Sequence, residues 1–187
     1  MKTGIIGSAG RLDDEAKLTY DVYQKTAKQV LTLCKDLGST HMVSGGAACI
    51  DHIGVSIYLR DYFDLILHLP AYFDMVDVKF ENGFDRFDDG RTLNYYHGAF
   101  SRKLGRNSLL DIKKALALGA TAHVTPGFKN RNTKVAEDSD ILIAATFGDG
   151  KNLKPGGTLD TWNKFTNLKP TNKKFHIDLH TGLVYDC

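Results

Sequence analysis

The sequence has few cysteines and almost no net charge. Its 187 residues include three cysteines, Cys34, Cys49 and Cys187, and no CxxC pair. This pattern argues against a disulfide framework and a cysteine zinc site, so we expect a reducing compartment, the cytoplasm. The formal net charge is +2, from 24 basic and 22 acidic residues. That balance lacks the basic excess typical of proteins that bind nucleic acid, and it argues against such a partner.

Long apolar stretches are also absent from the sequence. No segment approaches the roughly 20 apolar residues that span a bilayer. The first residues, MKTGIIGSAGR, lack the apolar length of a signal peptide. We therefore expect no membrane partner. Hydrophobic residues make up 42% of the chain and charged residues 25%, which is typical of a globular protein. The length predicts a single domain over residues 1–187, with a core of useful size.

The order of the apolar segments predicts an α/β fold. In the first part of the chain we expect strands at 2–7, 41–44 and 63–69, and helices at 13–37 and 47–60. Such alternation predicts a parallel sheet with right-handed crossovers. We therefore expect a Rossmann-like three-layer domain with a mainly parallel sheet.

The second part of the chain continues the alternation after an irregular segment. Residues 71–104 are rich in Asp, Gly, Arg and aromatic residues, and predict an insertion that covers a ligand site or forms an oligomer interface. Beyond it we expect a helix at 109–118 capped by Asn107 or Ser108, a strand at 120–124, a helix at 130–137, a strand at 140–146, a helix through Trp162, and a hairpin or edge strand from 176–179 and 183–185.

Three glycine turns follow the expected strands. They are GSAGR at 7–11, SGGA at 44–47 and PGGT at 155–158. The carboxyl ends of parallel strands open onto one edge of the sheet, and a helix that begins there directs free N–H groups at a ligand. One such turn often serves only the sterics of the connection, but three together favour a binding site. The sequence contains neither a complete P-loop nor a complete GxGxxG motif, which argues against those two modes of binding.

Four segments in this order resemble the SLOG superfamily: GIIGSAGR, VSGGAACID, GFKNRNTKVAEDSDILIAATFGDG and PGGTLDTWNKF, spanning positions 4–165. That superfamily includes the LOG-type nucleotide phosphoribohydrolases, the DNA-processing A proteins and sensor domains of nucleotide-signalled antiviral systems. The resemblance implies a nucleotide or nucleotide-derived ligand, such as an ADP-ribose-type or cyclic signalling nucleotide. It also implies a homo-oligomer, for which the aromatic residues of 71–104 would supply a surface.

The same resemblance implies roles for particular residues. The first turn and the GGT turn would contact phosphate, the SGG glycines would line the ligand, and an Arg-Asn pair would stand at the head of a helix. The ligand-binding residues that it implies are Gly7, Ser8, Arg11, Ser44, Gly45, Gly46, Asp51, Arg131, Asn132, Gly156, Gly157 and Thr158.

One departure from the resemblance bears on catalysis. The LOG hydrolases share PGGxGTxxE, with a glutamate near the ribose, whereas this chain reads PGGTLDTW. The nearest carboxylate is Asp160, which also suits the first turn of a helix. The departure favours a module that binds the ligand to sense or sequester it. The alternative is a hydrolase of nucleotide N-glycosidic bonds, using a carboxylate from Asp160, Asp85, Asp88 or Asp89. A DNA-handling role fits the charge least.

Other chemistry has weaker support. His176, Asp178 and His180 alternate and could together hold a metal. We favour a polar outer face of an edge strand, and predict no metal and no cofactor. Cys49 fits a small buried side chain better than a reactive thiol.

Aromatic residues are candidates to stack on a base. We consider only those of the irregular segment, Tyr72, Phe73, Tyr95 and Tyr96, and expect the others, Trp162 included, to fill the core. Even for these four, packing is the favoured role.

Overall fold

The computed structural model describes residues 1–11, 13–60, 63–82 and 88–187. The strands within those residues are β1 (Lys2–Gly7), β2 (His41–Ser44), β3 (Asp64–Leu69), β4 (Phe73–Asp74), β5 (Lys79–Phe80), β6 (Thr121–Val124), β7 (Ile141–Thr146), β8 (Lys174–Asp178) and β9 (Val184–Asp186). The helices are α1 (Asp13–Lys17), α2 (Tyr20–Asp36), α3 (His52–Tyr58), α4 (Asp89–Leu104), α5 (Ser108–Ala117), α6 (Phe128–Asp138) and α7 (Gly157–Leu168).

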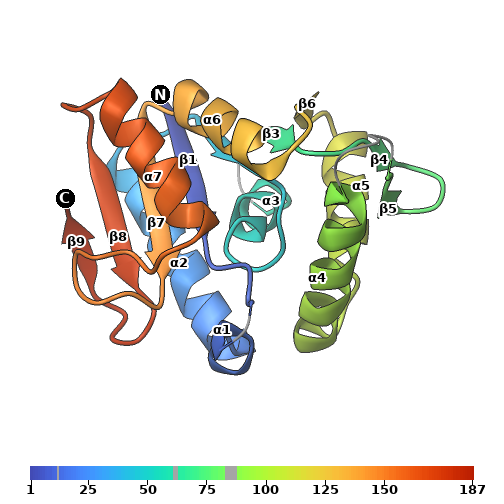
Figure 1. Ribbon diagram of the computed structural model, residues 1–187, viewed down its shortest axis with the longest axis horizontal. Helices are drawn as coiled ribbons and strands as arrows, with labels where there is room; N and C mark the ends of the chain where they lie inside the picture. Colours follow the sequence, from blue (N-terminus) through green and yellow to red (C-terminus); the bar gives the residue numbers. More distant parts are fainter. Residues whose placement is uncertain (12, 61–62, 83–87) are drawn as a thin grey trace.

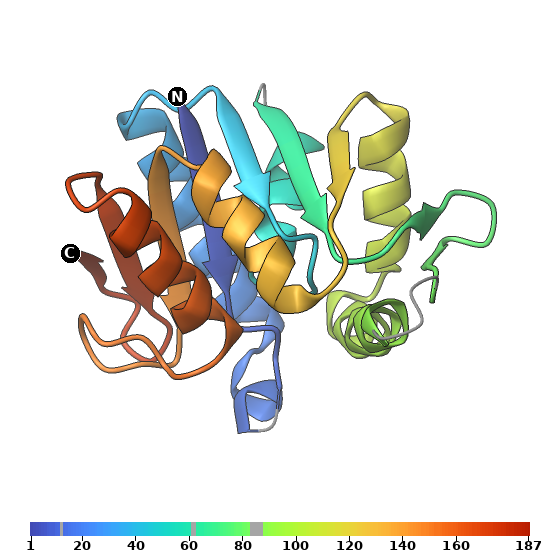
Figure 2. The same ribbon diagram turned by 45° about the horizontal axis from the view of Figure 1, so that its top comes forward.

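The fold is Rossmann-like, as the alternating pattern predicts (Figure 1). The main sheet has the order β6-β3-β2-β1-β7-β8-β9 in the described residues, and its neighbours pair in parallel except for β9, which runs antiparallel to β8. Helices α6 and α7 cover one face of the sheet, and α2 and α3 lie behind it (Figure 2). The three-layer architecture and the C-terminal hairpin are therefore confirmed.

The central strands are buried along most of their length because both of their faces are covered. Every residue of β7 is buried, and Ile5 of β1 lies opposite Ile143 of β7. This burial explains why continuous apolar runs identified the strands. Because β1, β7 and their parallel neighbours all end at the same edge, the turns that follow them are brought together.

Two predicted helices differ from the structure. The expected helix at 13–37 is two helices, because Thr19 accepts a hydrogen bond from the Val22 amide and starts α2 anew. The expected helix at 47–60 begins only at His52. Gly46 and Cys49 both have positive φ angles, 65° and 66°, which a right-handed helix does not allow, so the helix begins only after a turn at 49–51.

The irregular segment contains regular structure that its composition hid. A two-stranded hairpin of β4 and β5 is followed by α4, which buries Leu93, His97 and Phe100 on one face. The spacing of these three residues is helical, but a histidine at the centre of the buried face weakened the apolar pattern. In the described part of the chain, no helix combines the length and apolar character needed to cross a membrane.

Two glycines of α4 differ sharply in the room around them. A Cβ on Gly90 would lie 2.1 Å from the Glu81 carbonyl oxygen, whereas a Cβ on Gly98 would meet no atom within 4 Å. We expect Gly90→Ala to destabilise the fold by about 1–3 kcal/mol, because backbone must move to admit the methyl group. Gly98→Ala should stabilise it by about 0.5–1 kcal/mol, because alanine is the better helix former. Urea unfolding of the matched pair measures both; equal effects would contradict the packing of α4 on this hairpin.

Candidate functional site

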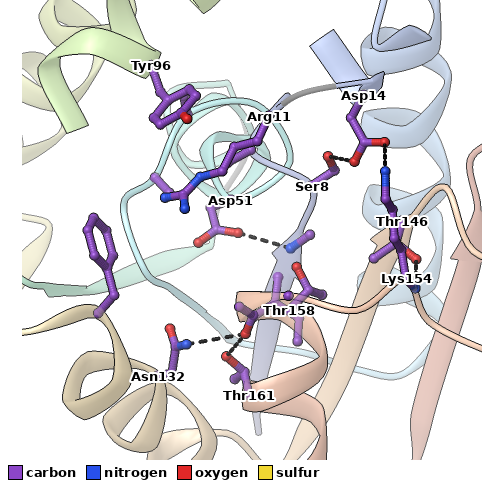
Figure 3. Close-up of a pocket in the computed structure, with 18 of the residues that line it drawn as sticks. Ser8, Arg11, Asp14, Asp51, Tyr96, Asn132, Thr146, Lys154, Thr158 and Thr161 are labelled. Atoms are coloured by element: carbon purple, nitrogen blue, oxygen red, sulfur yellow. Dashed lines mark hydrogen bonds and ion pairs between the residues drawn. The ribbon is translucent and has the colours of Figure 1, made fainter. Parts of the chain in front are cut away.

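A cavity of about 380 Å³ opens at the carboxyl edge of the sheet (Figure 3). Five regions of the chain form its walls: the turn after β1, the segment between β2 and α3, the loop and first turn of α7, the start of α6, and one face of α4. The lining residues are Ile6, Gly7, Ser8, Ala9, Arg11, Asp14, Ala47, Ala48, Asp51, Thr92, Leu93, Tyr96, Phe128, Arg131, Asn132, Thr146, Lys154, Pro155, Gly156, Gly157, Thr158 and Thr161.

Most of the residues that the sequence singled out meet in this cavity. Those that line it are Gly7, Ser8, Arg11, Asp51, Arg131, Asn132, Gly156, Gly157 and Thr158. The second glycine turn is different: Ser44, Gly45 and Gly46 are not among the lining residues. Ser44 is buried and donates to the Asp51 carbonyl at 2.7 Å. A Cβ on Gly45 would lie 1.4 Å from an Arg131 nitrogen, so this glycine makes room for the arginine.

A buried ion pair joins the two sides of the cavity. Asp51 accepts a hydrogen bond from the Gly7 amide at 3.0 Å and another from Arg131 at 3.2 Å. The two side chains are 7% and 8% exposed. Burial raises the pKa of Asp51, and the neighbouring guanidinium opposes that rise. Arginine stays protonated in proteins. The Nε of Arg131 is buried and has no hydrogen-bond partner among the described residues.

Arg11 is the cation of the cavity that no carboxylate neutralises within the described residues. Two other lining cations, Arg131 and Lys154, form ion pairs with Asp51 and Asp14. The Arg11 guanidinium instead lies over aromatic rings, 4.8 Å from the centroid of Tyr96 and 5.7 Å from that of Phe128. The cavity lining therefore carries one positive charge in excess, on an exposed side chain.

The amino terminus of α7 supplies backbone donors. Gly156 precedes the helix with a φ of 145°, a conformation that favours glycine. The first helical bond runs from the Asp160 amide to the Gly156 carbonyl. The amides of Gly157, Thr158 and Leu159 therefore have no partner within the helix, and the helix dipole adds positive potential at this end. An anion in the cavity would be attracted both by these free amides and by the positive end of the helix dipole.

Four further residues that line the cavity form a hydrogen-bonded group, which the sequence analysis did not identify as a group. Asp14 is buried and accepts from Ser8 at 2.6 Å and from Lys154 at 2.7 Å (Figure 3). The Lys154 amide also donates to Thr146 at 3.3 Å. These contacts join the first turn to the loop before α7. No sequence motif pairs Asp14 with Lys154, because they are 140 residues apart.

The structure places the candidate catalytic carboxylate outside the cavity lining. Asp160 accepts from Asn132 at 3.0 Å and from Lys164 at 2.9 Å. Burial alone would raise its pKa, but these two donors lower it below its ordinary value. Of the other candidates, Asp89 accepts from the Gly127 amide, Asp88 pairs with Arg91, and Asp85 lies outside the described residues.

Helix α4 is fixed as a wall of the cavity by contacts along its length. Asp89 holds the Gly127 amide at 2.8 Å, and Lys103 donates to the Leu18 carbonyl at 3.1 Å. Between them the buried ring of His97 contacts the Gly46 carbonyl at 3.0 Å and the Ser108 hydroxyl at 2.9 Å. Helix α4 of the predicted insertion thus lines the cavity through Thr92, Leu93 and Tyr96.

Three other expectations can be compared with the structure. His176 and Asp178 are buried, so the polar outer face that we favoured for them is wrong. The His176 ring contacts Thr146 and the Gly150 carbonyl, and no group of the described residues has the arrangement of a metal site. Cys49 is a buried thiol whose pKa is raised to about 12 by burial, as an unreactive side chain requires. Trp162 packs in the core.

Of the aromatic candidates, Tyr96 lines the cavity, and Tyr72, Phe73 and Tyr95 do not. Phe128, which the sequence analysis did not select, lines it as well. Its position three residues before Arg131, at the head of α6, was the available signal.

Comparison with known proteins gives one informative likeness. No protein-family model matches the chain. The chain is similar to the uncharacterized protein R261 of Acanthamoeba polyphaga mimivirus, with 41% identity over 142 residues, which are 74% of this chain and 70% of that protein.

Proposed function

The chain belongs to the same family as the uncharacterized mimivirus protein R261, and we propose that it binds a nucleotide or nucleotide-derived small molecule in the cavity at the sheet edge. The observation that carries the proposal is the convergence on one cavity of the turn after β1, the amides at the start of α7, and Arg11, which forms no ion pair with the residues that the structure describes. Free amides, a helix dipole and a guanidinium that can donate several hydrogen bonds are groups that bind phosphate.

The dimensions of the cavity support a small ligand. Its volume of about 380 Å³ lies within the range of roughly 300–1,000 Å³ that small-molecule sites occupy. Apolar side chains of Leu93, Ala47 and Ala48 face the same space as the phosphate-binding groups. A ligand with one anionic end and one apolar, flat end fits this division. We propose on the same grounds that the chain is a divergent SLOG protein, since its motifs surround this cavity.

The carboxylates of the cavity favour binding over cleavage. Both oxygens of Asp14 and both oxygens of Asp51 accept hydrogen bonds from the protein. Neither is free to stabilise positive charge on a ribose. We therefore propose a sensor or sequestering protein. The homo-oligomer and the cytoplasmic location stay predictions.

Replacing Arg11 tests the proposal. We expect Arg11→Ala to weaken the binding of AMP about tenfold or more, because a charge-assisted hydrogen bond contributes roughly 1.5–3 kcal/mol. Folding stability should change little, since the side chain is exposed. Isothermal titration calorimetry measures the affinity. Arg91→Ala is the matched control, because Arg91 is an exposed arginine of α4 that does not line the cavity. Equal affinities for the natural protein and Arg11→Ala would remove the phosphate role of this arginine.

A second candidate function, cleavage of a nucleotide N-glycosidic bond, is motivated by the resemblance to the LOG hydrolases. Asp160 is tied to Asn132 and Lys164, so we expect Asp160→Asn to leave AMP affinity within about twofold and to cost at most about 1 kcal/mol of stability. Chromatography of the nucleotide after incubation would detect released base. Base release by the natural protein that Asp160→Asn abolishes would make the hydrolase the better proposal.

A further inference from the structure

Two aromatic rings on different elements face the same side chain in the cavity. Tyr96 belongs to α4 and Phe128 begins α6, and each is half-buried and lines the cavity. Packing into the core therefore does not account for their exposed faces. Their shared neighbour is the Arg11 guanidinium, which lies 4.8 Å and 5.7 Å from the two ring centroids. Figure 3 shows the Arg11 side chain reaching from the first turn toward Tyr96.

The Arg11 guanidinium lies over the faces of two aromatic rings, where a flat heterocycle could also bind. Guanidinium groups are planar and stack on aromatic faces. Nucleic-acid bases stack on the same faces, with little preference for sequence. The Arg131 guanidinium also lies over this ring, 5.7 Å from the Phe128 centroid, and its position is fixed by the ion pair with Asp51. Arg11 has no such anchor among the described residues.

We propose that Tyr96 and Phe128 form a stacking subsite for a planar heterocycle, and that Arg11 fills this subsite until the ligand's phosphate draws it away. This inference rests on the proposed function, because it assigns a binding site to the flat end of the ligand whose phosphate the proposed function already places. Arg11 extends from the turn after β1, which lines the same cavity as the amides at the start of α7, so one ligand can engage the phosphate-binding groups and the rings together. A phosphate without a base leaves the rings exposed, and a base without a phosphate must compete with the guanidinium.

The proposal predicts opposite effects of one substitution on two probes. Arg11→Ala should bind adenosine more tightly than the natural protein does, because the subsite is vacant, while it binds AMP more weakly. Tyr96→Leu and Phe128→Leu should each lower the affinity for AMP and adenosine about tenfold. Both should bind ribose 5-phosphate at least as tightly as the natural protein does, because its phosphate no longer has to draw Arg11 away from that ring, and this binding also reports that the variants are folded. Tyr95→Leu is the matched control, since that ring is 69% exposed and does not line the cavity.

Calorimetry with adenosine, AMP and ribose 5-phosphate separates this proposal from the one on which it rests. If ribose 5-phosphate binds but Tyr96→Leu and Phe128→Leu keep full affinity for AMP and adenosine, the stacking subsite is overturned and the phosphate site stands. If adenosine binding depends on Tyr96 and ribose 5-phosphate does not bind, the subsite stands and the phosphate site falls. Failure of all three probes to bind the natural protein overturns both. Weaker adenosine binding by Arg11→Ala would overturn the part assigned to the guanidinium.

Discussion

Replacing Arg131 with methionine is expected to destabilise the fold by about 3–5 kcal/mol, because it leaves the Asp51 carboxylate buried without its partner. The two side chains are less than a tenth exposed, so water cannot take over the role of the guanidinium. The Gly45 site is shaped around Arg131 and would retain a void. Urea unfolding followed by circular dichroism measures the change.

Two further variants control for that result. Arg131→Met combined with Asp51→Asn should recover part of the loss, since no charge then stays buried and the asparagine oxygen can still accept from the Gly7 amide. Arg91→Met removes an ion pair whose side chains are 79% and 67% exposed, and should change stability by less than about 1 kcal/mol. A loss below 1 kcal/mol in Arg131→Met would contradict the role of the pair in holding the cavity together.

Acid is expected to unfold the protein through two buried histidines. Burial lowers the pKa of His52 and of His97 from 6.5 to about 3. At a pH between about 3 and 6.5, these two histidines are protonated in the unfolded chain and neutral in the folded one. Stability is therefore lost as the pH falls from 6.5 toward 3, by up to about 1.4 kcal/mol per pH unit for each histidine. Urea unfolding at a series of pH values measures this slope.

The region between pH 6.5 and 5 gives the clearest measurement. Burial raises the pKa of Asp51 and of Asp89, and a carboxyl that binds its proton more readily when folded acts in the opposite direction at lower pH. We expect His97→Gln to reduce the slope, because it removes one of the buried rings, while His52 and His68, whose pKa burial also lowers, maintain the remainder. Stability that is flat from pH 7 to pH 5 would contradict neutral, buried rings at His52 and His97.

The strands were predictable from the sequence because a strand that is buried on both faces is composed mainly of apolar residues. Parallel strands covered on both faces contain continuous apolar runs, which are long in β7, shorter in β3 and limited to Ile5 and Ile6 in β1. The start of α3 was not predictable, because the positive φ of Cys49 is set by the turn around it rather than by the residue type. Helix α4 was hidden because His97 makes its buried hydrogen bonds to Gly46 and Ser108, groups that only the tertiary structure brings near.

The same distinction applies to the site. Glycine turns after strands predict which backbone reaches the carboxyl edge, and the first and third turns do line the cavity. The partners of the charges were not predictable, because Asp51 with Arg131 and Asp14 with Lys154 join residues 80 and 140 positions apart. A carboxylate such as Asp160 looks available in the sequence. In the structure Lys164 and Asn132 both donate hydrogen bonds to this carboxylate.

Amide NMR of the protein titrated with AMP tests the central claim most directly. The claim places phosphate against the free N–H groups at the start of α7 and beside the turn after β1. The amide signals of Gly157, Thr158 and Ala9 should shift with the ligand concentration, whereas those of Gly105 and Gly119, which do not line the cavity, should stay in place. Unmoved signals at Gly157 and Thr158 at saturating AMP, or shifts confined to residues away from the cavity, would contradict the claim.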